Sequence, residues 1–225
     1  MLWAEIAIYW AIDFGNPATL RDATNQLSEL ILRDRNRASV VIWGLGNENA
    51  DTDARLRFMA RLTETARNLD GTRVVSAACL IDRQAKRIAD RLAAHLDVIG
   101  INEYYGWYEP DFRDLAAIGR NSAPGKPVII TETGGDGLAG LHGPQTTLTT
   151  EEHQAWIYRN QIATLREIPY VRGMAPWVLY DFRSLRRQNA YQRGYNIKGL
   201  IARDKQARKA AFAVLQAFYR EGTLP

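Results

Sequence analysis

Two glutamates, each placed at the end of an apolar run, are the residues of this sequence best suited to act together in catalysis. Glu48 follows "SVVIWGL" (39–45), and Glu132 closes "KPVIITE" (126–132). They are 84 positions apart (132 − 48 = 84), which is about 28 residues for each of three strand–helix units. Two facing carboxyl groups suit glycoside hydrolysis, in which one protonates the leaving oxygen and the other attacks the sugar carbon from about 5–5.5 Å.

Other predicted strands also end in polar or aromatic residues. These residues are Glu5, Asn47, Asn102, Tyr104 and Tyr105, Thr131, Trp177 and Asp181. In a parallel barrel all such ends meet on one face, where barrel enzymes place their chemistry. A single glutamate after a strand is more often a helix N-terminal charge or a solvated loop residue. Two of them at matched strand ends, flanked by amides and aromatics, favour catalysis.

The elements that must position these residues alternate along the chain. Apolar runs predict strands at 2–10, 39–45, 72–78, 97–102, 126–132 and within 171–182. Periodic spacing predicts helices at 16–34, 53–69, 82–96, 110–120, 149–168 and 204–220. Asn16 with Pro17 can open the first helix, and Thr149 with Glu152 has the spacing of a capping box.

Alternating strands and helices predict an α/β fold with a parallel sheet. The strands "VVIW" and "PVII" are apolar at consecutive positions, which is typical of strands covered on both faces. The pattern predicts a (β/α)8 TIM barrel with about six of its eight units present. No long linker interrupts residues 1–225, so we expect one domain or part of one.

The composition argues against several other classes of protein. The net charge is +4, but the basic residues are scattered, so we expect no nucleic-acid partner. Three scattered histidines make no metal-ligand cluster, and no GxGxxG or P-loop follows a strand, so we expect no cofactor. Cys79 lies in an apolar run and reads as a core thiol. Neither a signal peptide nor a membrane-length apolar run is visible, which predicts a cytoplasmic protein.

At these residues the sequence resembles the catalytic barrel of glycoside hydrolase family 2, the retaining glycosidases related to β-galactosidase and β-glucuronidase. "SVVIWGLGNE" resembles the acid/base signature of that family, and "KPVIITETG" resembles its nucleophile signature. "NEYYGWY" (102–108) and "DGLAGLH" (136–142) are similar to the β-glucuronidase branch. The resemblance runs from about residue 1 to residue 220, with several motifs in the family's order.

The resemblance implies a role for each matching residue. Glu48 would be the general acid/base, and Glu132 would be the nucleophile that forms a covalent glycosyl-enzyme. Asn47 would hydrogen-bond the sugar 2-hydroxyl, Tyr104 would orient Glu132, and Trp177 would stack on the sugar. The implied substrate-binding residues are Asn47, Asn102, Tyr104, Tyr108, Trp177, Asn196 and Lys198.

The substrate is implied by "GYNIKGL" (194–200), where β-glucuronidases resemble one another in an Asn-x-Lys motif that reads the sugar C6 carboxylate. Asn196 and Lys198 match that motif, so the resemblance implies a terminal β-D-glucuronide or an oligosaccharide as substrate. Arg183, Arg186 and Arg187 either help to hold an anionic sugar or form a solvated cluster. Glu103 stands where β-glucuronidases often have Arg, and Thr133 stands where an aromatic residue is usual.

The family's architecture places two β-sandwich-like domains and two barrel units before the segment that begins here. If Met1 begins the third unit, the chain holds units three to eight, and we expect little or no activity from the 225 residues alone. Two alternatives stay open: a β-galactosidase or β-mannosidase specificity, and an inactive carbohydrate-binding or structural remnant. A homo-oligomer also stays open.

Overall fold

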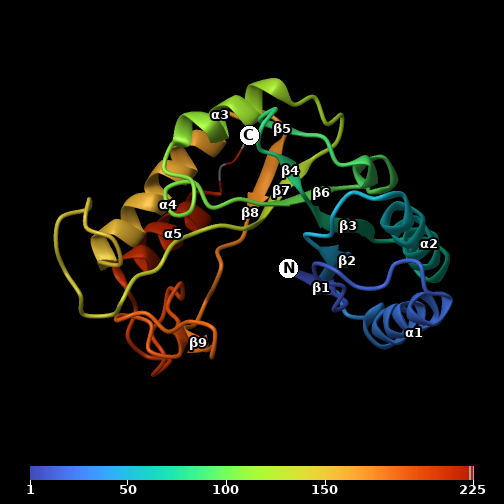
Figure 1. Cartoon of the computed structure of the whole chain (residues 1–225), viewed down its shortest axis with the longest axis horizontal. Coiled ribbons are helices and arrows are strands. Elements are labelled where there is room, and N and C mark those ends of the chain that lie inside the picture. Colours follow the sequence, from blue (N-terminus) through green and yellow to red (C-terminus); the bar gives the residue numbers. More distant parts are fainter. Residues whose placement is uncertain (223, 225) are drawn as a thin grey trace. The chain divides into compact units, whose positions relative to one another are not determined.

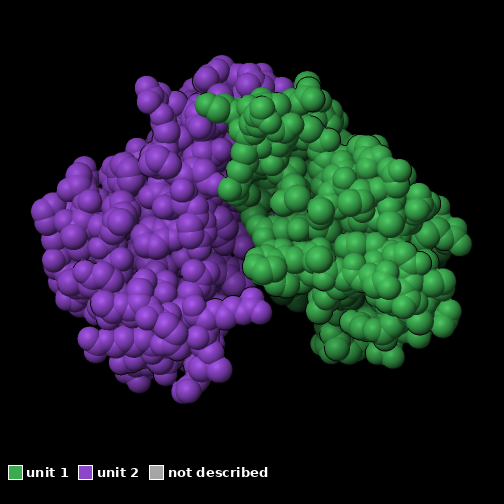
Figure 2. All heavy atoms as spheres, in the orientation of Figure 1, with its two compact units in different colours: residues 1–102, 122–129 green, residues 103–121, 130–225 purple. Residues whose placement is uncertain are grey.

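The computed structural model describes residues 1–222 and 224 of the chain. These residues form two compact units, coloured separately in Figure 2. Unit 1 contains residues 1–102 and 122–129, and unit 2 contains residues 103–121 and 130–225. Because the boundary falls within one strand, the backbone of that strand leads from unit 1 into unit 2.

Unit 1 is built on parallel strands covered by helices (Figure 1). Strands β1 (Leu2–Glu5), β2 (Val40–Asn47), β3 (Val74–Cys79) and β6 (Ile99–Asn102) pair in that order and are parallel. Helices α1 (Pro17–Asp34) and α2 (Asp53–Leu69) pack against each other beside these strands. Fully buried side chains from strand and helices, including Trp43, Leu27 and Met59, fill the space between them.

The first two helices begin and end close to where their sequence signals predict. The Asn16 side chain accepts a hydrogen bond from the backbone N–H of Ala18, and Pro17 occupies the first turn of α1. Thr52 caps α2 in the same way through the N–H of Arg55. Both predicted helices are therefore confirmed, because local capping and the apolar period agree.

The predicted helix at 82–96 is wrong. This segment forms a hairpin of β4 (Ile81–Asp82) and β5 (Arg87–Ile88), followed by the short 3-10 helix η1 (Arg91–His95). The cause is Asp90, whose buried carboxylate accepts two hydrogen bonds from the Arg55 guanidinium at 2.6 and 2.9 Å. The same carboxylate caps the N–H of Leu92, so residue 90 must be extended and cannot lie inside a helix.

Unit 2 contains most of β7, the strand β8 and three helices. Strand β7 (Val128–Glu132) begins in unit 1, and its residue Ile130 accepts a hydrogen bond from Ala175, which follows β8 (Val171–Met174). The complete sheet order is β1-β2-β3-β6-β7-β8, the order of consecutive barrel strands. Helices α3 (Phe112–Asn121), α4 (Glu151–Arg166) and α5 (Ala210–Glu221) belong to this unit, in which α4 packs on α3 and on α5. A small antiparallel ribbon joins β9 (Phe182–Arg183) to β10 (Tyr195–Asn196).

Several predicted boundaries move for identifiable reasons. Helix α4 is capped by Thr150, which accepts from the N–H of His153, so the capping box predicted at Thr149 is wrong by one residue. Helix α5 begins at Ala210 rather than at 204, because the Asp204 carboxylate accepts backbone hydrogen bonds from residues 206 and 207 and so holds a turn. The strand predicted over 2–10 ends at Glu5.

The structure also tests the predictions about Cys79 and about membrane-spanning segments. Cys79 is a free and buried thiol, which confirms the core assignment, and burial raises its pKa. Among the described residues, the helices are all too short or too polar to cross a membrane.

Candidate active site

Glu48 lies directly after β2 in unit 1, within a network of amides. The Asn102 side chain, at the end of β6, donates to Glu48 Oε1 at 3.1 Å and to Asn47 Oδ1 at 2.9 Å. The backbone N–H of Glu48 donates to the carbonyl of Ala78 on β3 at 3.0 Å. Three neighbouring strand ends therefore fix this carboxylate, and the structure brings together Asn47, Glu48 and Asn102 as the sequence predicts.

Trp10 is a residue of this site that the sequence did not indicate. Its indole Nε1 donates to Glu48 Oε2 at 2.8 Å. Its backbone N–H donates to the carbonyl of Asn47, and its own carbonyl accepts from the Asn49 side chain. Trp10 and Glu48 both have positive φ angles, 51° and 52°, a conformation that non-glycine residues adopt at a cost and that is frequent in active sites.

Tyr9 and Trp10 present a pair of aromatic rings beside Glu48. The rings stack with centroids 4.5 Å apart and an angle of 24° between their planes. About half of each residue is exposed, 49% in both cases. In the sequence these two aromatic residues lie in the apolar run "IYWA", which predicts only a strand. The positive φ angle of Trp10 cannot be read from the residue types.

Glu132 closes β7 in unit 2 and is held by the segment that follows β6. The Tyr104 hydroxyl donates to Glu132 Oε2 at 2.6 Å, and the N–H of Glu103 donates to the Glu132 carbonyl at 3.0 Å. The ring of Tyr104 meets the ring of Tyr108 edge to face at 5.3 Å. The predicted contact between Tyr104 and Glu132 is therefore present.

Glu103 is buried in the interior of unit 2 and is 1% exposed. Its Oε2 accepts from the Gln161 side chain on α4 at 2.9 Å and from the N–H of Tyr105 at 3.1 Å. Burial raises the pKa of this carboxyl group to about 7, although the two hydrogen bonds favour its ionised form. Glu103 thus supports the backbone that carries Tyr104 and is not a substrate contact.

Trp177 follows β8 and is half-buried in unit 2. Its backbone N–H donates to the carbonyl of Thr133, directly after Glu132, at 2.8 Å. Its ring meets Phe182 of β9 edge to face at 6.1 Å, and the peptide bond between Trp177 and Val178 is cis. The chain after β8 is thus tied to the chain after β7.

The two residues of the Asn-x-Lys motif are both buried in unit 2: Asn196 and Lys198. The Asn196 side chain accepts from the N–H of Lys198 at 3.0 Å. The Lys198 ammonium lies over the rings of Trp107, at 4.9 Å, and Tyr108, at 5.0 Å. Lys198 thereby connects the motif to the aromatic residues that follow β6.

Asp136 is a second residue that sequence reasoning missed. Its Oδ1 lies 2.7 Å from Lys198 Nζ, and both residues are only 1% exposed. Its Oδ2 accepts from the Gln192 side chain at 2.6 Å. The sequence placed Asp136 in a glycine-rich loop, and nothing in its spacing connects it to a lysine 62 positions later.

A second buried ion pair joins Lys209 to Asp181 and holds the backbone directly after the Asn-x-Lys motif. Lys209 Nζ lies 2.7 Å from Asp181 Oδ1, and the same oxygen accepts from the N–H of Gly199. Burial raises the pKa of Asp181 and lowers that of Lys209, which the mutual attraction of the pair opposes. A side chain at position 199 would collide with the Asp181 backbone, so this position requires glycine.

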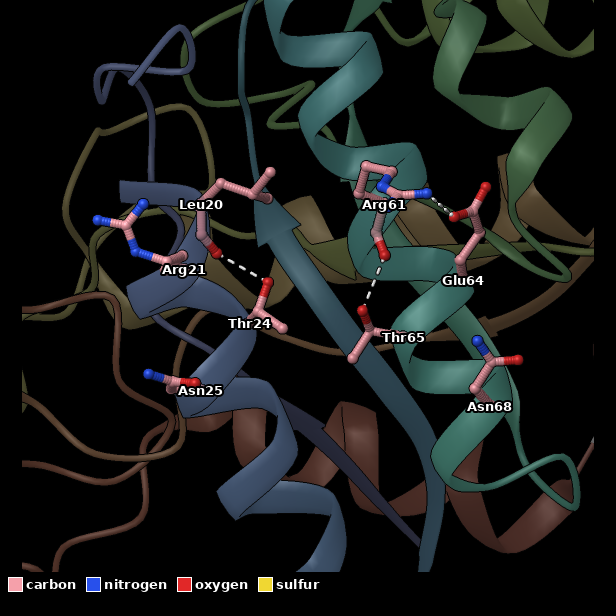
Figure 3. A pocket seen from close by; sticks show the side chains of 8 residues that line it. All are labelled: Leu20, Arg21, Thr24, Asn25, Arg61, Glu64, Thr65 and Asn68. Atoms are coloured by element: carbon pink, nitrogen blue, oxygen red, sulfur yellow. Dashed lines mark hydrogen bonds and ion pairs between the residues drawn. The ribbon is translucent and has the colours of Figure 1, made fainter. Parts of the chain in front are cut away.

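Two pockets are lined by described residues, and the second of them includes Asp181 and Gln192. One, of about 470 Å³, is lined by α1 and α2; in Figure 3 its Arg61 pairs with Glu64, and Thr24 and Thr65 donate to carbonyls of their own helices. The other, of about 790 Å³, is lined in unit 2 by residues that include Tyr191, Arg193 and Arg203. Within residues 1–222 and 224, no group of three or more His, Cys, Asp or Glu side chains has metal-ligand geometry.

Parallel strands that end in carboxylates, amides and aromatic residues are the arrangement found in barrel enzymes, including the barrel glycosidases. Residues 2–221 match the model described as glycosyl hydrolases family 2, TIM barrel domain. The chain therefore belongs to glycoside hydrolase family 2, and its fold is an incomplete TIM barrel with six of the eight strands.

Several relatives of this chain are β-glucuronidases. The β-glucuronidase of Paenibacillus borealis is 32% identical over 224 residues, which cover 95% of this chain and 36% of that protein. The Mus musculus β-glucuronidase is 31% identical, with coverage of 92% and 33%. The chain thus spans about a third of the length of these curated relatives.

Solved structures of family 2 enzymes are also similar to this chain. A family 2 β-galacturonidase from Eisenbergiella tayi, bound to galacturonate, superposes with a TM-score of 0.83 and 25% identity, covering 99% of this chain and 41% of that one. A β-glucuronidase from an uncultured Clostridium species gives a TM-score of 0.78 with 28% identity, covering 94% and 39%.

Proposed function

We propose that this chain carries the catalytic residues of a retaining glycosidase that removes terminal β-D-glucuronides. One observation carries the proposal. Within unit 2, an unbroken series of contacts leads from Glu132 through Tyr104 and Tyr108 to Lys198. A carboxylate suited to attack a sugar is thus connected to a cation suited to attract a sugar carboxylate.

In the proposed reaction, Glu132 attacks the anomeric carbon and forms a covalent glycosyl-enzyme while Glu48 gives a proton to the leaving oxygen. Glu48 then takes a proton from the water that releases the sugar. The Tyr104 hydroxyl donates to Oε2 of Glu132 and so holds this carboxylate in one orientation. Asn47 and Asn102 would contact the sugar hydroxyls, since amides can donate to one group and accept from another.

For the substrate, the C6 carboxylate would lie near Asn196, Lys198 and Tyr108. A charge-assisted hydrogen bond to a carboxylate favours a uronate over a neutral hexose, which has no charge at that position. Trp177 would stack on the apolar face of the ring. The relatives named β-glucuronidase support a glucuronide, and the galacturonate-bound neighbour keeps a galacturonide as a second candidate, since the two sugars share the C6 carboxylate.

The sharpest test uses a trapping reagent that needs no acid. 2-Deoxy-2-fluoro-β-D-glucuronyl fluoride has a leaving group that departs without protonation, so it reports on the nucleophile alone. We expect a single covalent adduct on the peptide that contains Glu132, absent in Glu132→Gln and present in the matched Glu48→Gln variant. An adduct on another residue, or none, would contradict the assignment.

We also propose that the 225-residue chain turns over slowly by itself, because a complete barrel has eight strands and this sheet has six. Robust hydrolysis of 4-methylumbelliferyl β-D-glucuronide by the purified chain would overturn this part alone. A preference for neutral aryl glycosides, insensitive to Lys198→Ala, would select a β-galactosidase or β-mannosidase specificity. Sugar binding with neither turnover nor trapping would select an inactive remnant.

A further inference from the structure

Two aromatic rings lie exposed beside Glu48 in unit 1. Tyr9 and Trp10 stack with their ring centroids 4.5 Å apart, and each residue is 49% exposed. By contrast, Trp43 and Phe58 of the same unit are buried in its core. A large apolar pair left at the surface is more informative than a buried one, and flat aromatic surfaces of this kind bind other rings by stacking.

The backbone holds this aromatic pair in a fixed position. The N–H of Trp10 donates to the carbonyl of Asn47 at 3.0 Å, and the N–H of Asn47 donates to the carbonyl of Ile8 at 2.8 Å. The side chain of Asn49 donates to the carbonyl of Trp10 at 2.8 Å. A Cβ at Gly46 would lie 2.8 Å from the carbonyl oxygen of Ile8, so glycine lets the two segments approach this closely. A surface that is already fixed loses little conformational entropy when a ligand binds to it.

The hydrogen bond from Trp10 to Glu48 places the two rings beside the leaving group of the proposed reaction. The indole Nε1 lies 2.8 Å from Oε2 of Glu48. In that reaction the same carboxyl group protonates the leaving oxygen, which must then lie within hydrogen-bond distance of it, at about 2.7 Å. The group bonded to the leaving oxygen therefore lies close to Trp10 and to the ring stacked on it.

We propose that Tyr9 and Trp10 form the surface that binds the leaving group, and that they favour a planar aromatic group over a small alkyl group. Tyr9 is the specificity-determining residue of the pair, because Trp10 also donates to the carboxylate of Glu48. Aromatic rings pair best when they are offset or edge to face, with centroids about 4.5–7 Å apart, and a half-exposed ring allows both arrangements. The assignment rests on the proposed function, since it takes Glu48 to be the acid.

The same surface would also hold an alcohol that takes the place of water in the second step of the reaction. The hydroxyl oxygen of the alcohol bonds to the anomeric carbon, the bond from that carbon to Glu132 breaks, and the hydroxyl proton passes to Glu48. The product is a new β-glucuronide. An aromatic alcohol that stacks on Tyr9 and Trp10 should therefore release the covalent adduct faster than methanol at the same concentration.

The test uses the adduct that 2-deoxy-2-fluoro-β-D-glucuronyl fluoride forms with the 225-residue chain. After excess reagent is removed, benzyl alcohol or methanol is added over a range of concentrations, and intact-mass measurements follow the loss of the adduct. We expect Tyr9→Ala to reduce the acceleration by benzyl alcohol by about threefold to tenfold, because the stacking ring is lost. The acceleration by methanol, which has no ring to stack, should stay within about twofold of the wild type.

Three further variants separate stacking from other effects. Tyr9→Phe keeps the ring and should behave as the wild type does. Tyr9→Leu keeps apolar bulk without a ring face, should lose part of the acceleration, and repeats the test if Tyr9→Ala does not fold. Tyr191→Ala is the matched control, because it removes a ring of similar exposure, 48%, from unit 2.

The other outcomes contradict either the surface or the reaction, and they can be told apart. Wild-type acceleration by benzyl alcohol in Tyr9→Ala, or equal losses with both alcohols, would overturn the assignment of Tyr9 and leave the proposed glycosidase intact. A wild-type adduct that benzyl alcohol releases no faster than methanol would also overturn it. Failure of the wild-type chain to form an adduct on Glu132 would reject the proposed function, and the leaving-group surface with it.

Discussion

The indole of Trp10 donates a hydrogen bond to Oε2 of Glu48 over 2.8 Å, although the two residues lie 38 positions apart. Asn102 donates to the other oxygen of the same carboxylate. Glu48 is thus held from both sides by groups that can only donate to it. The general acid that we propose at Glu48 must keep a fixed direction toward the leaving oxygen, and these two donors would provide it.

Replacing Trp10 with Phe removes the donor and keeps an aromatic ring. We expect the residual rate on an alkyl β-glucuronide, whose departure needs a proton, to fall by about tenfold. The rate on 4-nitrophenyl β-D-glucuronide, which needs less protonation, should fall less. Steady-state rates on the two substrates, compared in parallel with Tyr9→Phe, check this; equal losses on both substrates would show that Trp10 does not act through Glu48.

The short hydrogen bond from Tyr104 to Glu132 can be tested by Tyr104→Phe, which deletes only the hydroxyl. Without it Glu132 loses a charge-assisted hydrogen bond that orients its carboxylate, and the rate of covalent trapping should fall by about tenfold to a hundredfold. Time-resolved intact-mass measurement of the adduct gives this rate directly. Tyr219→Phe, which removes a hydroxyl that donates to the carbonyl of Met174, serves as the control for fold. An unchanged trapping rate in Tyr104→Phe would show that the Tyr104 hydroxyl does not orient Glu132 for attack.

Glu103 gives a prediction for the dependence of stability on pH. Its pKa is raised to about 7 in the folded protein by burial, from an unfolded value near 4.5. The folded state therefore binds more protons than the unfolded state between these values, and the contribution to stability is lost as pH rises through about 7. From pH 5 to pH 8 the free energy of unfolding of the wild type should fall by about 2–3 kcal/mol relative to that of Glu103→Gln. Urea titrations of both proteins measure the difference; parallel curves would refute a raised pKa.

The ion pair of Lys198 and Asp136 predicts strong non-additivity. Lys198→Met leaves Asp136 buried and uncompensated, which should cost about 3–5 kcal/mol in the free energy of unfolding. Adding Asp136→Leu should recover most of this loss, because an apolar pair of similar volume replaces the charges. A double-mutant cycle measured by urea unfolding provides the coupling energy. Additive losses would mean that the two charges do not depend on each other.

The sequence predicts well the elements that depend on neighbouring residues, and it misses those that depend on contacts with distant residues. The helix at 53–69 follows from an apolar period that can be read within one segment, and the structure adds a cap at Thr52. The segment 82–96 has a similar period, yet the buried Arg55 binds Asp90 from another helix and stops it from being helical. Hydrophobic period alone carries no information about such a distant partner.

The candidate site divides in the same way. Glu48, Asn102 and Glu132 could be found because each lies at the end of an apolar strand or directly after it. The carboxyl ends of the strands lie on the face of a barrel where its catalytic residues are placed. Trp10 and Asp136 could not, because their contacts span 38 and 62 positions and pass through turns whose backbone angles the residue types do not reveal.

The buried pair of Asp136 and Lys198 also restricts how this protein can change over generations. A substitution at either position alone leaves a charge stranded in the interior, so a lineage can alter one only together with the other, or through a destabilised intermediate. Among homologues, positions 136 and 198 should therefore change together or not at all.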